Sequence, residues 1–380
     1  MLRSVCITSG QLIRRSFSST VPKSVLGVPT DHACNISESV ASRVGRNLHL
    51  LSNHPLSILR SKVEACFPDF NVFSNLPPVV SVQDNFDRLL FPKTHISRSQ
   101  SDTYYVNENT VLRTHTSAHQ YQLLSSRKDP FLVIGDVFRR DEIDQTHYMA
   151  FHQCEGLRMF PAGTSVDNVV NDLKTSLERL CRSLFGMAAE MRWVDAYFPF
   201  TDPSFELEVF YGGKWMECLG CGVVHRDLVK NVSRHPEIGW AFGLGLERLA
   251  MVLFEIPDIR LFWSNDSRFL KQFEEGKISK FQPFSKYPAC YKDISFWLPQ
   301  DVQKVWSDND FFEVVRSIAG DLAESVVCID QFTHPMTGQL SKCFRINYCA
   351  VDKTLTNQET GELQEKLRST VVSRFGVALR

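Results

Sequence analysis

Two adjacent arginines, Arg139 and Arg140, follow an apolar stretch and precede Asp141 and Glu142. Neighbouring side chains of a strand point to opposite faces, so at least one arginine should reach the working face of a sheet. The planar guanidinium group of arginine suits a phosphate. The same four residues could instead form a network of surface ion pairs. The pattern therefore leaves a phosphate site and a surface network as alternatives.

A second group of chemically useful residues is the segment Phe151-His152-Gln153-Cys154-Glu155. In a strand, Phe151, Gln153 and Glu155 would share one face. A flat aromatic ring, an amide and a carboxylate in a row would suit a purine ring beside an ammonium group. A half-buried strand whose polar residues face water would show the same alternation.

A hairpin is predicted around Gly212–Gly213, because two glycines between strand-like runs favour a two-residue turn. Counting outwards from this turn places Glu208 opposite Glu217. Like charges directly opposite each other destabilise a strand pair unless a cation or a shared proton compensates them. Mg²⁺ bound to a nucleotide is the natural candidate, because it takes one or two carboxylates together with phosphate oxygens. A solvent-exposed pair, or a register shifted by one residue, would need no cation.

A glycine-rich segment, Gly243 to Arg248, leads into a helix predicted over Leu244–Phe254. Glycines let another group approach the backbone closely, and a helix N-terminus attracts anions. Arg248 would lie one turn into this helix. The segment alone is weak evidence, but beside the other groups it favours a nucleotide site.

Two residue pairs look like metal ligands, but both are incomplete. His115 and His119 have the spacing of a helical metal pair, yet the glutamate of HExxH and a third ligand are missing. Hydrogen bonding to a small polar ligand, or a loop with satisfied histidines, explains them better. Cys218 and Cys221 form one CxxC without a second pair, so buried thiols on a strand are expected.

The elements that must position these residues fall into two blocks, which run from about Leu26 to Trp263 and from Phe281 to Arg380. In the first block, the predicted strands and hairpin are Phe131–Val137, Met149–Arg158, Phe205–Leu219 and Ile238–Phe242, and the predicted helices are Leu50–Cys66, Val169–Phe185 and Leu244–Phe254. Strands joined by hairpins, with helices laid against them, indicate an antiparallel sheet. Neither GxGxxG nor GxxxxGK[ST] is present, so the phosphate loops of parallel sheets are excluded.

The second block has its own rhythm of strands and helices. Its predicted elements are the strand Ile294–Leu298, the helix Asp310–Ile318, the strand pair Val326–Phe332 and Leu340–Val351, the helix Leu363–Phe375 and a short strand Val377–Leu379. This βαββαβ order is the split-βαβ sandwich pattern, which supports many functions. The polar stretch 264–280 between the blocks is expected to be a surface helix or a linker.

The composition fits an ordinary globular protein of two or three domains. The chain has 380 residues, 43% of them hydrophobic and 22% charged, with a formal net charge of −1. This rules out collagen-like, low-complexity and disordered proteins, and no stretch approaches the ~20 apolar residues of a membrane span. Residues 1–30 are rich in Arg and Ser and contain no acid, which is typical of an organelle transit peptide. A merely disordered N-terminus is the alternative.

Together these segments resemble a known family. The Phe-Arg-Arg-Asp segment with Arg139, the Phe-His-Gln-Cys-Glu strand and Gly-Leu-Gly-Leu-Glu-Arg are similar to motifs 2 and 3 of class II aminoacyl-tRNA synthetases. Thr116-Ser117-Ala118-His119-Gln120, Tyr197-Phe198-Pro199-Phe200 and the second block narrow the resemblance to the single-chain phenylalanyl-tRNA synthetases of mitochondria. The resemblance spans essentially the whole chain.

The resemblance implies an α+β fold: an antiparallel class II sheet with flanking helices, followed by a ferredoxin-like sandwich that binds the anticodon. The implied divisions are a transit peptide at 1–25, a catalytic domain at 26–263, a linker at 264–282 and the anticodon-binding domain at 283–380. The implied activity is ATP-dependent attachment of phenylalanine to mitochondrial tRNA(Phe) through a phenylalanyl-adenylate. The implied place of action is the mitochondrial matrix, and the implied state is a monomer that binds no membrane.

The resemblance also assigns roles to individual residues. Arg139 would hold the α-phosphate of ATP, Arg248 the γ-phosphate and Phe151 the adenine ring. Glu217 would bind ATP through Mg²⁺, with Glu208 as a second candidate ligand. The other residues placed at the ATP site are Thr146, His147, Tyr148 and Phe242. The residues placed around phenylalanine are Ser117, Ala118, His119, Gln120, Gln153 and Glu155, with Phe198 and Phe200 clasping the phenyl ring from one strand face.

Two rival functions can be weighed against this one. A related synthetase could activate another aromatic amino acid, but Phe198 and Phe200 offer no partner for a tyrosine hydroxyl. A non-catalytic relative could bind RNA through the second block alone. Arg139, Glu217 and Arg248 argue against that, because a binding protein has no need of all three.

Overall fold

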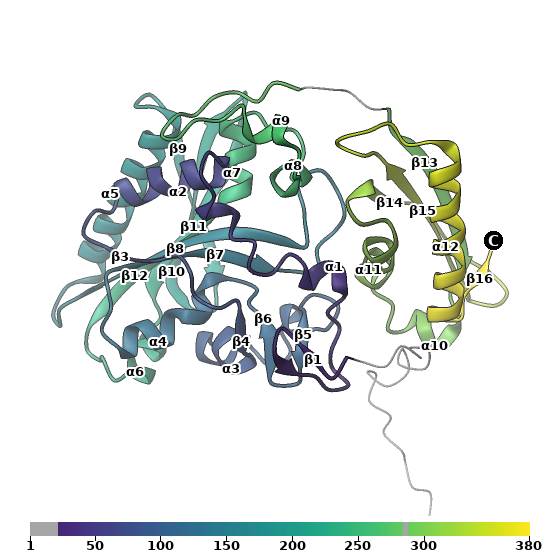
Figure 1. Ribbon diagram of the computed structural model, residues 1–380. Helices are drawn as coiled ribbons and strands as arrows, with labels where there is room; N and C mark the ends of the chain where they lie inside the picture. The colour runs from purple at the N-terminus through teal and green to yellow at the C-terminus, as the bar shows by residue number, and fades with distance from the viewer. Residues whose placement is uncertain (1–21, 284–287) are drawn as a thin grey trace, which may run out of the picture.

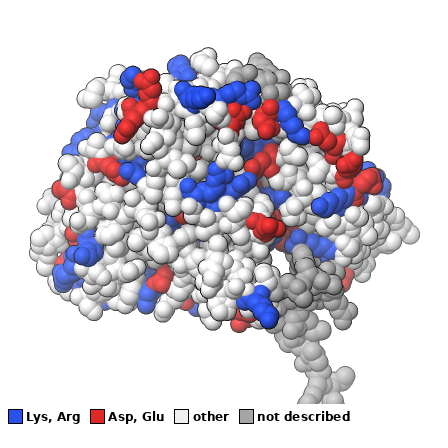
Figure 2. Space-filling model, in the orientation of Figure 1, with Lys and Arg blue, Asp and Glu red and all other residues white. Residues whose placement is uncertain are grey.

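A computed structural model describes residues 22–283 and 288–380 of the chain. The predicted transit peptide, 1–25, therefore lies almost entirely outside the described residues. The rest of the chain forms two bodies that pack side by side, with the C-terminal one on the right in Figure 1. Charges of both signs are interspersed over the face shown in Figure 2.

The larger body is built on a seven-stranded sheet with the order β3-β7-β8-β12-β11-β10-β9. These strands are β3 (Asn71–Phe73), β7 (Phe131–Phe138), β8 (Ala150–Phe160), β9 (Met191–Phe198), β10 (Thr201–Tyr211), β11 (Lys214–Val224) and β12 (Ile238–Gly245). Every neighbouring pair is antiparallel except β3 and β7, which run parallel. The predicted antiparallel sheet is confirmed, with one parallel strand added at its edge.

Three helices cover one face of this sheet: α2 (Pro55–Ala65), α5 (Val166–Phe185) and α7 (Leu246–Leu253). Their apolar faces and the buried side chains of the sheet form the largest hydrophobic core. Ser165 caps α5 by accepting a hydrogen bond from the amide of Asn168. The opposite face of the sheet stays open at its centre, and this is where the polar residues converge.

The segments bordering that open face come from the first third of the chain. They include the small sheet β4 (Val79–Ser81), β6 (Thr110–Leu112) and β5 (Tyr105–Asn107), and the turn η5 (Thr116–His119) that continues into α4 (Gln120–Ser125). The remaining short elements of this body are β1 (Ser24–Val25), β2 (Val28–Pro29), α1 (Glu38–Ala41), η2 (Leu48–Leu50), α3 (Val82–Asn85), η3 (Asp87–Leu89), η4 (Ile96–Arg98), α6 (Arg226–Asn231), α8 (Arg260–Trp263) and α9 (Ser267–Leu270).

The hairpin has the predicted register, with Tyr211 opposite Lys214 and Glu208 opposite Glu217. Beyond this pair the ladder shifts by one residue between Leu207 and Glu208. Two predicted helices begin later than expected: the helix expected at Leu50 begins at Pro55, and the one expected at Leu244 begins at Leu246. In the second case, the glycine-rich segment is the end of a strand.

The C-terminal body is the predicted βαββαβ sandwich. Its elements are β13 (Cys290–Trp297), α10 (Gln300–Gln303), α11 (Asp308–Ala319), η6 (Gly320–Leu322), β14 (Ala323–Thr333), β15 (Leu340–Tyr348), α12 (Asn357–Phe375) and β16 (Ala378–Leu379). The sheet order is β14-β15-β13-β16. Helices α11 and α12 bury their apolar residues in a second core.

The stretch between the two bodies is less free than a linker would be. Phe269, Phe273 and Phe281 are buried in the core of the first body. Their rings contact one another around Phe269. The stretch expected to be a surface helix or linker is therefore largely a packed extension of the larger body.

The two bodies are joined by a buried polar interface. Glu313 of α11 accepts hydrogen bonds from the Tyr104 hydroxyl at 2.9 Å and from Nε of Arg140 at 3.1 Å. Arg140 also pairs with Asp310 at 3.1 Å. One of the two adjacent arginines thus belongs to an ion-pair network, but this network is buried and joins the two bodies, whereas the alternative prediction was a surface network with Asp141 and Glu142.

Candidate active site

The floor of the open sheet face lacks side chains at its centre. Gly243 pairs with Glu155, and Gly245 pairs with Gln153, so these glycines lie beside the two polar residues on the same face. A Cβ atom added at either glycine would meet nothing within 4 Å. The glycines therefore leave open volume for a ligand next to Gln153 and Glu155.

Glu155 is the centre of a buried polar cluster at one side of this floor. Its carboxylate accepts hydrogen bonds from the Ser117 hydroxyl and, at 2.7 Å, from Nε2 of Gln120. Gln153 accepts a hydrogen bond from the Thr116 amide at 3.3 Å. Burial raises the pKa of Glu155 to about 7, against the opposing effect of these donors. A buried carboxylate near neutrality is suited to receive an ammonium group.

Aromatic rings gather beside this cluster. The rings of Phe198 and Phe200 lie 6.1 Å apart, and the Phe198 ring lies where a Cβ of Gly220 would be. Phe198 ends β9, but Phe200 lies in the following turn, so the prediction that both occupy one strand face is wrong. The turn nevertheless brings the two rings together. Phe91 is a third ring of this group, since it contacts Phe200 at 6.0 Å.

The other side of the floor carries two arginines. The guanidinium of Arg139 lies over the Phe151 ring at 5.1 Å, and its Nε donates to the Thr114 carbonyl at 2.9 Å. Arg248 pairs with Glu217 at 3.0 Å. Burial lowers the pKa of Arg139, and the charge of Arg248 lowers it further. Two cations facing the same space suit an anion with several charges.

Three carboxylates lie close together next to Arg248. Burial and then the charges of Glu217 and Glu208 raise the pKa of Glu206. Glu208 contacts Arg192 and Glu217 contacts Arg248, so arginines compensate the like-charged pair. The pairing of Glu208 with Glu217 therefore does not need a bound cation to offset the repulsion between the two carboxylates. Within the described ranges, no group of three or more His, Cys, Asp or Glu residues forms a metal cage.

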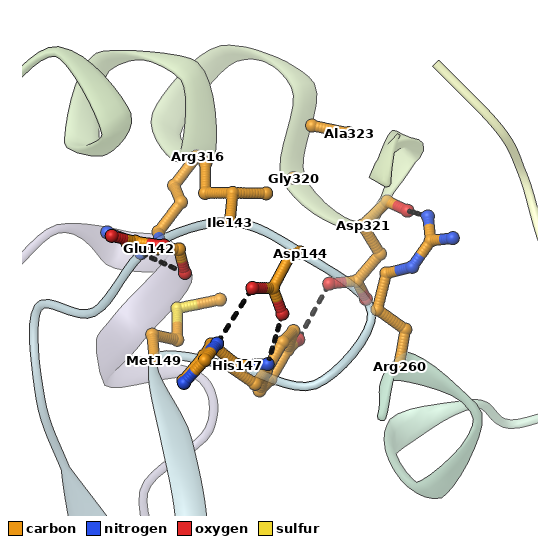
Figure 3. A pocket seen from close by; sticks show the side chains of 11 residues that line it. Glu142, Ile143, Asp144, His147, Met149, Arg260, Arg316, Gly320, Asp321 and Ala323 are labelled. Carbon is orange, nitrogen blue, oxygen red and sulfur yellow. Dashed lines mark hydrogen bonds and ion pairs between the residues drawn. The ribbon is translucent and has the colours of Figure 1, made fainter. Parts of the chain in front are cut away.

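The loop between β7 and β8 lies against the C-terminal body (Figure 3). The Asp144 carboxylate accepts hydrogen bonds from the Thr146 amide at 2.6 Å and the His147 amide at 2.8 Å. Tyr148 donates to Asp321 at 2.6 Å and stacks on Trp263 at 5.4 Å. The Tyr148 ring is therefore buried at the contact between the two bodies, and its assignment to the ATP site stays a prediction.

Phe242 also lies away from the open face. Its ring stacks on Phe67 at 5.3 Å and covers Gly156, within the helix-covered core. In β12, side chains alternate between faces, so Gly243 faces the site and Phe242 does not. The Phe242 side chain therefore belongs to the helix-covered core, and its assignment to the border of the nucleotide site stays a prediction.

His115, which precedes η5, and His119, the last residue of η5, have separate surroundings. His119 Nε2 lies 2.9 Å from Nη1 of Arg113, behind the Glu155 cluster. His115 stacks on Phe91 at 5.7 Å and lies 6.4 Å from Phe200, so it faces the aromatic pocket. Neither a helical metal pair nor a direct contact of His119 with the pocket is present. Ala118, between them, is buried.

The cysteines behave as the sequence indicated. Cys218 and Cys221 are buried free thiols, and Cys218 Sγ lies 3.6 Å from Sγ of Cys181. Both thiols point into the core beneath α5 because Cys218 occupies the position where the ladder shifts.

Sequence reasoning assigned no role to two residues of this site, Glu206 and Arg113. Glu206 joins the carboxylate group, and Arg113 supports the polar cluster from behind. Glu206 could have been found, because it lies two residues before Glu208 and shares its strand face. His115 was considered only for hydrogen bonding to a small polar ligand, whereas in the structure it lines the aromatic pocket.

Comparisons with known proteins agree with this geometry. The family "tRNA synthetases class II core domain (F)" matches residues 39–273, and the "Ferredoxin-fold anticodon binding domain" matches residues 285–380. The catalytic body is thus a class II aminoacyl-tRNA synthetase core.

Curated relatives narrow the class. The chloroplastic/mitochondrial phenylalanine–tRNA ligase of Arabidopsis thaliana is 49% identical over 92% of this chain and 83% of its own length. The mitochondrial phenylalanine–tRNA ligase of Mus musculus is 46% identical over 94% of this chain and 89% of its own. That of Saccharomyces cerevisiae is 39% identical over 91% and 92%. The chain belongs to the organellar phenylalanine–tRNA ligase family.

Proposed function

We propose that the protein activates phenylalanine with ATP and transfers it to mitochondrial tRNA(Phe). The observation that carries this proposal is the pairing, across one glycine floor, of the Glu155 cluster with Arg139 and Arg248. The first side suits an amino acid and the second a triphosphate. Family membership and the matching domain order support the same activity.

At the nucleotide side, Arg139 would hold the α-phosphate and stabilise the charge that develops there as the phenylalanine carboxylate attacks it. Phe151 would stack on adenine, and Arg248 would hold the γ-phosphate. In the described structure Arg248 contacts Glu217, so ATP would replace one of its ion-pair contacts. Positioning and charge stabilisation supply the rate here, without a side-chain nucleophile.

The carboxylates beside Arg248 fit a cation that is shared with phosphates. Mg²⁺ usually takes only one or two protein carboxylates and completes its shell with phosphate oxygens and water. Glu217 is half exposed and faces the arginine that would hold the γ-phosphate. When bound, the cation would neutralise phosphate charge. Glu208, which is engaged by Arg192, remains a second candidate ligand.

At the amino-acid side, Glu155 would receive the ammonium group, with Gln153, Ser117 and Gln120 around it. The phenyl ring would lie among Phe198, Phe200 and His115. Burial and the neighbouring charge of Arg139 lower the pKa of His115 to about 3, so a neutral imidazole lines the pocket. Ala118, His119, Thr146 and His147 stay in the proposal only as neighbours of these groups.

The C-terminal body would bind the anticodon region of the tRNA. We further propose that the chain works as a monomer in the mitochondrial matrix, after loss of a transit peptide near residue 25. The proposed divisions remain 26–263, 264–282 and 283–380, with the middle stretch packed on the first. Among the helices of the described ranges, none is long and apolar enough to cross a membrane.

Pyrophosphate exchange into ATP tests the activation step directly. Exchange should depend on phenylalanine and be much weaker with tyrosine or tryptophan. Preference for another aromatic amino acid would support the rival synthetase, and no exchange by folded protein would support the non-catalytic rival. Charging of tRNA should be lost on removal of residues 288–380, whereas charging that survived would overturn the anticodon-binding assignment.

A further inference from the structure

One buried carboxylate joins two elements of the site. The first is β8, which carries Phe151 and Glu155, the residues proposed to bind adenine and the ammonium group, and the second is α7, which carries Arg248. Glu247 of α7 accepts a hydrogen bond from the His152 amide through Oε2, at 2.7 Å. Its other oxygen, Oε1, lies 2.7 Å from Nδ1 of the same histidine. Because an ionised carboxylate only accepts, Nδ1 carries the proton in this contact. Both side chains are buried, with 0% and 2% exposure.

The Glu247 carboxylate accepts a backbone hydrogen bond of β8 at the point where the pairing with β12 ends. β12 pairs with β8 as far as Gly245, which lies opposite Gln153. At the next residue of β8, His152, the chain of β12 has already turned into α7, and the Glu247 side chain meets the free amide. The start of α7 therefore stays hydrogen-bonded to β8 through the Glu247 side chain.

The two residues alternate with the proposed ligand-binding groups. His152 lies between Phe151 and Gln153 in β8, so its side chain points to the opposite, helix-covered face. Glu247 directly precedes Arg248, which is largely exposed. Neither His152 nor Glu247 can contact ATP, but each is bonded through the backbone to a residue proposed to do so.

The histidine ring is held by aromatic neighbours. It lies 5.0 Å from the ring of His49 and stacks on Trp263 at 5.7 Å, and both of these residues are buried. Nε2 has no hydrogen-bond partner within the described residues. The only strong polar tie of the His152 side chain is therefore the one to Glu247.

We propose that His152 and Glu247 are positioning residues, which fix the distance between Phe151 on β8 and Arg248 on α7. This inference rests on the proposed function of those two residues as ATP-binding groups. Breaking the contact would leave a buried carboxylate short of a donor and let strand and helix move apart. A misplacement of about 1 Å costs on the order of a hundredfold in rate.

The test compares two variants. His152→Leu removes the ring donor to Glu247 and leaves the main-chain amide, and His152→Asn keeps a side-chain amide donor near the position of Nδ1. We expect His152→Leu to lower kcat of phenylalanine-dependent pyrophosphate exchange at least about tenfold. KM for ATP should rise more than KM for phenylalanine, because Phe151 and Arg248 both serve ATP. His152→Asn should recover most of both losses.

His54→Leu is the matched control. His54 is also buried in the same core, but its side-chain hydrogen bonds go to the Phe262 carbonyl at 3.0 Å and the Leu56 amide at 3.2 Å, not to β8 or α7. It should lower the unfolding temperature while leaving kcat and KM unchanged in the folded enzyme. If His152→Leu lost only stability, as this control should, the positioning role would be overturned.

Two further measurements keep the result decisive. Should His152→Leu fail to fold, His152→Phe keeps a flat ring between His49 and Trp263 without a donor, and it should show the same selective rise in KM for ATP. Calorimetric titration with Mg·ATP alone separates the two proposals. If the wild-type protein bound Mg·ATP but gave no exchange with phenylalanine, the proposed function would fail, and a weaker affinity in His152→Phe would still support the positioning role.

Discussion

A single carboxylate illustrates how the residue scale governs this site. Glu155 is fully buried, and burial raises its pKa to about 7. Its folded-state pKa thus lies above that of an unfolded glutamate. Protonation therefore stabilises the folded protein as the pH falls from about 7 towards 4.5, and ionisation above pH 7 costs stability. This loss of stability arises at the position where the ammonium group of a bound amino acid would compensate the buried charge of Glu155.

Glu155→Gln should separate stability from binding. The neutral amide avoids the buried charge, so the unfolding temperature at pH 8 should rise by about 2–4 °C, with a smaller rise at pH 5. Phenylalanine-dependent exchange should fall by at least about a hundredfold, because no charge remains for the ammonium group. Scanning calorimetry at both pH values, with exchange kinetics, checks this. A loss of stability that was larger at pH 8 would contradict it.

The same carboxylate predicts a pH dependence of substrate binding. Below pH 7 the empty site holds a proton that must leave before phenylalanine binds, so KM for phenylalanine should fall as the pH rises from 6 to 8. Calorimetric titration in buffers of different ionisation enthalpy should detect the released proton at pH 6.5. Equal heats in all buffers would contradict the assignment of Glu155.

Arg139 should matter for rate rather than for folding. Its Nε bonds one carbonyl and its guanidinium lies over Phe151, so Arg139→Ala removes few stabilising contacts. We expect kcat to fall by about two to three orders of magnitude, as for other groups that stabilise transition-state charge. The unfolding temperature should change little. Arg140→Ala is the contrasting variant, since Arg140 binds the C-terminal body and should lose stability.

Sequence reasoning found the site residues whose geometry follows from strand alternation. Gln153 and Glu155 were placed together because a strand repeats every second residue, and the structure brings them to one cluster. It could not predict the surroundings of Tyr148 and Phe242, because their positions depend on packing against distant segments. Tyr148 is held by Asp321, which lies 173 residues away in the chain. No local pattern carries that information.

At the scale of elements, the glycine floor is the feature that makes room for ligands. Gly243→Ala should fold normally, because nothing lies within 4 Å of the added carbon and its backbone is not left-handed. The methyl group would occupy ligand space, so exchange activity should drop at least tenfold. Gly361→Ala in α12 is the control: it also has open space, and it should be neutral or slightly stabilising. Wild-type kinetics in Gly243→Ala would contradict the floor.

Most elements were predictable because their patterns are local. The Gly212–Gly213 turn fixed the hairpin register, and α5 followed from its apolar periodicity. The start of α7 was not predictable from periodicity, because leucines at 244 and 246 fit either a strand or a helix. The pairing of β12 with β8 decides that question, and pairing is a tertiary interaction.

At the scale of the whole molecule, Glu313 is the main polar tie between the two bodies. Glu313→Gln removes the carboxylate shared by Arg140 and Arg316 and leaves Arg140 with Asp310, so the variant should lose part of the about 3–5 kcal/mol that breaking a buried ion pair typically costs. The C-terminal body should therefore separate more readily, and small-angle scattering should show a larger radius of gyration. Glu365→Gln on the exposed side of α12 is the control. Superimposable scattering curves for all three proteins would contradict this.

The interface has one more property. Ile143 belongs by sequence to the loop between β7 and β8, yet it is buried in the core of the C-terminal body. The amide of Val326 in β14 donates to its carbonyl at 2.9 Å. The anticodon-binding domain therefore completes its hydrophobic core around a side chain that the catalytic body supplies. Full packing of this domain thus depends on a correctly folded catalytic body.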